Sequence, residues 1–192
     1  MKKKSIVIII LTVLIAVALM LALYFVFAGN SIDNIELSLE NFKNNGEYQY
    51  GEIGWGSSVA QVNEALPYAL EEDTSRTPPA STGYVFYKSK NTYTLDGQST
   101  VASVEFHDGT LQVIQFAFHV GQNYQQWFES QGTELSRLYG AHSDKAENAS
   151  DMFESTIYTW STDNSMLQIV LLTGKNLVPT VTISVGAKPA NR

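Results

Sequence analysis

The chain has 192 residues and no cysteine, and its 12 basic and 19 acidic side chains give a net charge of −7. The absence of cysteine excludes a disulfide framework, a thiol nucleophile and a lipid-modified cysteine. The acidic balance argues against nucleic acid as a partner, because its phosphates would be repelled.

The first 28 residues predict a membrane anchor. An uncharged, apolar run of 23 residues, 6–28, follows Lys2, Lys3 and Lys4. As a helix this run would be roughly 34 Å long, against a hydrocarbon core of about 30 Å. The lysines predict a single pass through the cell membrane, with a cytoplasmic N-terminus and an extracellular C-terminal domain. The alternative is a signal peptide cleaved after Ala28, which would leave the domain secreted.

The remainder of the chain carries a net charge of −10, because three basic residues and no acidic ones lie in the first 28. Residues 29–50 are mostly polar and predict a tether, although the alternation of Ile35, Leu37 and Leu39 leaves a short edge strand open. The extracytoplasmic domain is expected to span residues 51–192.

A first helix is predicted over residues 58–66. Ser58 and Gln61 have the spacing of a capping box, in which each side chain bonds the backbone of the other residue. Pro67 disfavours the helical conformation of the residue before it, so the helix should end there.

A second helix is predicted over residues 123–139, with Asn123 as its cap and Gly140 as its C-terminal stop. We expect both helices to pack on one face of a sheet, where replacing Phe116 by Ala should cost roughly 3–5 kcal/mol. The residues expected to be buried together are Val62, Leu66, Phe128, Leu135 and Leu138 with Val104, Phe106, Phe116, Val181 and Ile183.

Six segments rich in β-branched and aromatic residues predict strands: 84–88, 101–106, 111–118, 153–161, 166–173 and 180–185. A further short strand over 92–95 is left open. The polar stretches 71–79 and 141–151 predict loops. At the turn around Asp108 and Gly109, a three-residue loop with Gly109 in the left-handed region is preferred over a two-residue loop. It places Phe106 and Phe116 on the same face of the sheet.

The order helix, polar loop and three strands occurs twice, over about 51–120 and 121–187. It predicts an α+β domain with a mainly antiparallel sheet and helices on one face. This order, with Gly56-Ser57-Ser58, Val62 and Leu66 on the first helix, resembles the tandem fold of the secreted β-lactamase inhibitor proteins. A single repeat resembles the small outer-membrane assembly lipoproteins. The resemblance implies binding rather than catalysis.

The residue patterns predict no metal, cofactor or catalytic residue. His107, His119 and His142 lack the spacing of a zinc site, and no nucleophile-elbow motif surrounds any serine. The leading hypothesis is a membrane-tethered module, not an enzyme, that binds a protein or a cell-envelope polymer. The alternatives are an envelope hydrolase with an unrecognised site and a passive scaffold subunit.

The binding surface is expected on the sheet face away from the helices, because antiparallel sheets can leave that face in contact with water. By alternation this face should carry Ser103, Glu105, Gln115, Ala117, Thr180, Thr182 and Ser184. Tyr158 and Trp160 should point outward beside them, since Ile157 lies on the other side of their strand. The alternative is that Trp160 belongs to the core. The candidate binding residues are therefore Tyr158, Trp160, Glu105 and Gln115.

Overall fold

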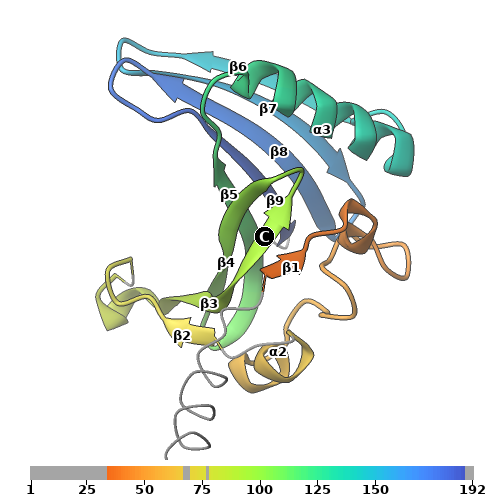
Figure 1. Ribbon diagram of the computed structural model, residues 1–192. Helices are drawn as coiled ribbons and strands as arrows, with labels where there is room; N and C mark the ends of the chain where they lie inside the picture. The colour runs from red at the N-terminus through yellow and green to blue at the C-terminus, as the bar shows by residue number, and fades with distance from the viewer. Residues whose placement is uncertain (1–33, 67–69, 77, 189–192) are drawn as a thin grey trace, which may run out of the picture. The chain divides into compact units, whose positions relative to one another are not determined.

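The computed structural model describes residues 34–66, 70–76 and 78–188. These residues contain strands and helices in the order β1(Asn34–Glu36), η1(Leu39–Phe42), α2(Val59–Ala65), β2(Leu70–Glu72), η2(Ala80–Thr82), β3(Tyr84–Leu95), β4(Gln98–His107), β5(Thr110–His119), α3(Tyr124–Tyr139), β6(Asp144–Ala149), β7(Phe153–Ser161), β8(Ser165–Gly174) and β9(Thr180–Ala187) (Figure 1). The elements η1 and η2 are single turns of 3-10 helix.

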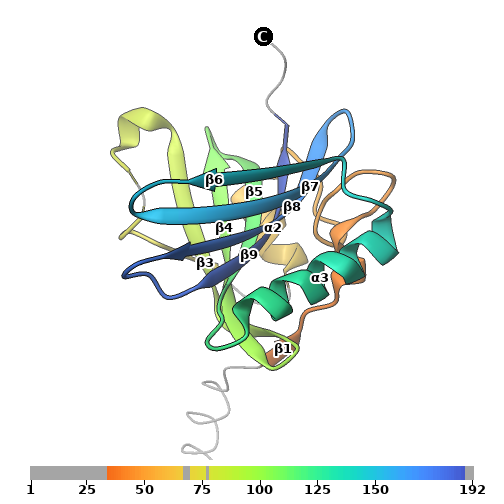
Figure 2. The same cartoon turned by 90° about the horizontal axis from the view of Figure 1, so that it is seen from above.

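All the described strands belong to one sheet, in the order β1-β3-β4-β5-β9-β8-β7-β6, with β2 also paired to β3. We call β3, β4 and β5 the first half and β7, β8 and β9 the second half (Figures 1 and 2). The halves join where β5 runs antiparallel to β9, with Phe116 opposite Ile183. The last strands of the two predicted repeats are therefore neighbours.

One face of this sheet carries the core. α3 packs against β8, β9 and η1, and α2 packs against β5 (Figure 1). The predicted helix residues Val62, Leu66, Phe128 and Leu135 are buried there, and Leu138 is half-buried. The five sheet residues expected beneath them are fully buried: Val104, Phe106, Phe116, Val181 and Ile183.

The two predicted helices are confirmed to within a residue, but their caps differ. The side chain of Ser58 accepts a hydrogen bond from the backbone N–H of Gln61. The side-chain carbonyl of Gln61 accepts one from the backbone N–H of Ser58, so the capping box is present. Asn123 occupies the cap position of α3, but its φ is 73° and its side chain makes no capping bond. The predicted Asn123 cap is therefore wrong.

The β4–β5 turn has two residues, and the three-residue prediction is wrong. Asp108 and Gly109 both have positive φ, and His107 pairs with Thr110. The register then shifts, since Phe106 pairs with Leu111 whereas Glu105 pairs with Val113. This bulge restores the alternation and brings the large aromatic residues onto the buried face, as the sequence predicted.

Residues 34–50 are part of the domain and not a tether. β1 pairs in parallel with β3, and the following segment buries Leu37, Leu39, Phe42, Tyr48 and Tyr50. Phe42 and Tyr50 both lie against the ring of Phe116, with centroids 5.7 and 5.2 Å away. The alternation of Ile35, Leu37 and Leu39 indicated the short strand, but the buried residues Phe42, Tyr48 and Tyr50 follow neither the helical nor the strand period as one run, so the sequence did not place the segment in the core.

The predicted class, an α+β domain with a mainly antiparallel sheet behind a transmembrane helix, is wrong. The described residues form mostly one mixed β-sheet of nine strands, with two α-helices. The parallel β1–β3 pair makes the sheet mixed. β6 forms within a stretch expected to be a loop, and β2 overlaps the start of the other such stretch. No described helix is long and apolar enough to cross a membrane, and the predicted span, 6–28, lies outside the described residues.

Candidate functional site

Tyr158 and Trp160, the two rings expected on the exposed face, are buried beneath α3. Trp160 is 1% exposed, and its indole nitrogen donates to the carbonyl of Gly140 at 2.8 Å. The Tyr158 hydroxyl donates to the carboxylate of Glu129 on α3 at 3.2 Å. A Cβ on Gly132 would lie 3.1 Å from the Tyr158 ring, so this glycine makes room for the ring.

The predicted orientation of these rings is therefore wrong. The alternation along β7 is as expected, but the face covered by α3 is the one that carries Tyr158 and Trp160, while Ile157 lies on the other. Glu105 and Gln115 lie on the face away from α3, so the four candidate residues do not form one site.

The open face of the sheet, opposite the core, carries the residues that alternation assigned to it. Each is half-buried and alternates with a buried core residue: Ser103, Glu105, Gln115, Ala117, Thr180, Thr182 and Ser184. That part of the sequence prediction is confirmed. In the parts of the chain that the structure describes, neither α-helix packs on this face.

A polar row crosses seven strands of the open face. Register partners link one polar side chain to the next through Lys88, Ser103, Gln115, Ser184, Gln168, Thr159 and Asp144. Gln168 donates to the Thr159 hydroxyl at 3.1 Å. The central members are neutral amides and hydroxyls, which can exchange hydrogen bonds with a partner without desolvating a charge.

A mainly apolar row runs beside it. Its members are half-buried register partners on β5, β9, β8, β7 and β6: Ala117, Thr182, Val170, Ile157 and Ala146. The open face thus combines neutral hydrogen-bonding groups with aliphatic surface, as protein-binding surfaces do.

At the β3–β4 end, the segment before β3 folds against the open face. The Arg76 guanidinium donates to the Ser103 hydroxyl at 2.7 Å and lies 4.8 Å from the centroid of the Phe86 ring. Burial raises the pKa of Glu105, while the nearby Arg76 charge acts in the opposite direction. This end of the face is partly covered, and its charges are already engaged with one another.

Four large apolar side chains of the second half are between 43% and 78% exposed: Met152, Phe153, Leu177 and Val178. They lie at the β6–β7 and β8–β9 turns, which Figures 1 and 2 show at the same end of the sheet. A Cβ on Gly174 would lie 2.6 Å from the Met152 carbonyl and 2.9 Å from a Leu177 methyl group, so the turns touch. We call these four residues the apolar end. Their adjacency depends on strand pairing, which the sequence did not reveal.

A serine, an acid and a histidine lie close together on β4 but are not connected as a catalytic triad. Ser103, Glu105 and His107 alternate along β4, yet the Ser103 hydroxyl accepts its hydrogen bond from Arg76. The His107 ring stacks on Tyr84, with centroids 4.3 Å apart. The nucleophile–base hydrogen bond that a triad requires is not formed by these side chains.

The three histidines are also separate from one another. The Nδ1 of His119 lies 3.0 Å from the Thr180 hydroxyl, and His142 stacks on Tyr158. Over the residues that the structure describes, no group of three or more His, Asp or Glu side chains could hold a metal ion.

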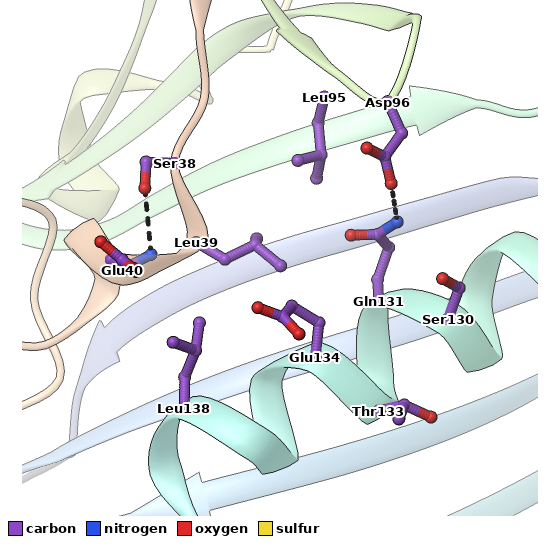
Figure 3. Close-up of a pocket in the computed structure, with 10 residues that line it drawn as sticks. All are labelled: Ser38, Leu39, Glu40, Leu95, Asp96, Ser130, Gln131, Thr133, Glu134 and Leu138. Carbon is purple, nitrogen blue, oxygen red and sulfur yellow. Dashed lines mark hydrogen bonds between the residues drawn. The ribbon is translucent and has the colours of Figure 1, made fainter.

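A pocket of about 600 Å³ lies between η1, the β3–β4 turn and α3 (Figure 3). Its lining includes three carboxylates, from Glu40, Asp96 and Glu134. Gln131 donates to Asp96 at 2.6 Å, and Arg137 pairs with Glu134 at 2.6 Å. Two of the three carboxylates are therefore already bonded within the protein. Asp96 links the β3–β4 turn to α3, and Glu134 forms an ion pair within the last turns of α3.

No protein-family model, curated protein or solved structure matches the chain. The resemblance to β-lactamase inhibitor proteins and assembly lipoproteins stays a prediction.

Proposed function

We propose that this domain is a binding module that recognises a protein partner through the open face of its sheet. The observation that supports the proposal is the polar row across seven strands, flanked by an aliphatic row and left uncovered by the two α-helices. The apolar end extends this surface, because Phe153 lies on the open face by alternation along β7.

A protein partner suits this face better than a cell-envelope polymer. Aromatic rings give a site large, rigid contact surfaces, and Tyr158 and Trp160, which were expected to supply them, are buried under α3. The centre of the face instead offers Gln115, Gln168 and Ser184, together with aliphatic neighbours. Such groups complement the mixed polar and apolar surface of another protein.

Gln168→Arg tests the proposal, because Gln168 lies next to Ser184, the middle member of the polar row, and alternates with the buried Leu167 and Ile169. The matched control is Gln126→Arg, at an exposed position of α3. Tagged full-length chains carrying each substitution are compared by quantitative affinity capture from the cells that produce the protein.

The Gln168→Arg chain should lose at least one protein that the parent and the Gln126→Arg chain both capture, at an unchanged melting temperature. The same captured proteins from all three chains would contradict the proposal. Loss of the same proteins from both variants would also contradict it, because the effect would then not belong to the open face.

A further inference from the structure

β6 is an edge strand whose outer side is unpaired among the described strands. It ends the sheet order and pairs with β7. All its residues are exposed except Ala146, which is half-buried. An edge of this kind presents free backbone N–H and C=O groups to another strand.

The β6–β7 hydrogen bonds show which residues of β6 direct their backbone N–H and C=O groups away from β7. The amide of Ser150 donates to the carbonyl of Phe153 at 2.8 Å and closes the hairpin. Bonding alternates along an antiparallel ladder, so Asn148 and Ala146 bond to β7. Lys145 and Glu147 lie between these positions and present their backbone groups outward.

The sequence of β6 is complementary to itself when read in the opposite direction. It runs Asp144-Lys145-Ala146-Glu147-Asn148. An antiparallel partner related by a two-fold axis at Ala146 places Lys145 opposite Glu147 of the second copy, in both directions. Asp144 then faces an amide from Asn148, and the two small Ala146 side chains meet on the axis.

The neighbouring registers are unfavourable. In the dimer, residues whose backbone groups point away from β7 must pair with residues of the same kind in the second copy. The two nearest alternative registers therefore have their two-fold axis at Lys145 or at Glu147. The first places two ammonium groups directly opposite each other, and the second places two carboxylates opposite each other. Like charges in directly opposed positions destabilise a strand pair. Only the register centred on Ala146 is attractive at every charged position.

We propose that β6 pairs antiparallel with β6 of a second copy of this chain, forming a two-fold symmetric dimer with one continuous sheet. Lys145 and Glu147 already form an ion pair within each copy at 2.8 Å. The dimer extends this pair into a ring of alternating charges. It also joins the two open faces into one surface, although the pairing itself does not depend on what that surface binds.

Reciprocal charge variants of the full-length chain test the dimer by sedimentation equilibrium. Lys145→Glu gives β6 two neighbouring carboxylates, and Glu147→Lys gives it two neighbouring ammonium groups. Each variant alone should raise the dimer Kd about tenfold or more, because both cross-strand pairs become repulsive. Mixing the two variants should restore association at the parent Kd, because every cross-strand pair is again attractive.

The controls are Lys175→Glu and Glu52→Lys, which make the same charge changes at exposed positions outside β6. They should leave the Kd unchanged, and melting curves confirm that every variant is folded. A monomeric parent chain at all concentrations would overturn the proposal. So would equal effects of the β6 and control substitutions, or a mixture of the two β6 variants that stays monomeric.

Discussion

The two halves of the sheet are covered in different ways. The second half lies under α3, whose 16 residues form a helix about 24 Å long. The first half has α2, with seven residues and a length of about 10 Å, over strands that span about 33 Å. The rest of its cover is the irregular segment 37–53, which buries Phe42, Tyr48, Tyr50 and Ile53.

This difference shows that a sheet face can be closed by aromatic side chains from irregular chain where regular structure is too short. The contacts concentrate on Phe116, where Phe42, Tyr50 and Tyr93 approach within 5.7 Å between ring centroids. The first half therefore depends on single buried rings from a segment with little regular secondary structure, whereas the second half is covered by one long helix that packs on β8 and β9.

The largest expected effect is at this aromatic cluster. Phe116→Ala and Phe42→Ala should each lower the free energy of unfolding by roughly 3–5 kcal/mol, because both rings are fully buried and leave cavities. Urea unfolding curves measure the change. A Phe42→Ala curve superimposable on that of the parent would show that segment 37–53 does not close the first half.

A smaller effect is expected where this segment meets the second half. The Glu47 carboxylate accepts hydrogen bonds from Ser165, Thr162 and Asn164 at the β7–β8 turn, and these bonds hold its pKa below the ordinary value of 4.5. Because the pKa is depressed in the folded state, the stabilisation is present above pH 4.5 and is lost as pH falls through the folded-state pKa.

Glu47→Gln should therefore lower stability by about 1 kcal/mol at neutral pH and by progressively less below pH 4.5. Urea unfolding of both proteins across this range measures the difference. A difference that does not vary with pH would show that the carboxylate charge plays no part in this contact.

Effects no larger than this should distinguish the N-terminal ends of the two helices. Ser58→Ala removes the capping box of α2 and should cost about 1 kcal/mol. Asn123 makes no capping bond and has a positive φ, so Asn123→Gly should leave stability unchanged or raise it slightly. Thermal melts measure both. A loss of stability in Asn123→Gly as large as that in Ser58→Ala would contradict the described geometry.

The parts of the fold that could be predicted from sequence are those where periodicity and burial agree. Val181, Ile183 and Val185 alternate with polar residues and are fully buried. β6 could not be recognised, because it lies at the sheet edge with only Ala146 partly buried, and so has no apolar alternation.

Alternation also predicted part of the open face, because it depends only on the order of residues along each strand. Alternation correctly separated Glu105 and Gln115 from the core, and it correctly placed Tyr158 opposite Ile157. It could not reveal which face of β7 the helix would cover, because that depends on the pairing of strands and on the reach of α3. The apolar end was missed because Met152 and Leu177 become neighbours only through the same pairing.

The central claim, that the open face binds a protein, is tested most directly by site-specific photocrosslinking in intact cells. A photoreactive amino acid is placed at Gln168 on the open face or at Gln126 on α3, in otherwise unchanged full-length chains. The account predicts that position 168 crosslinks to one discrete protein and that position 126 does not. Crosslinking of that protein from position 126 alone, or no adduct from position 168, would contradict it.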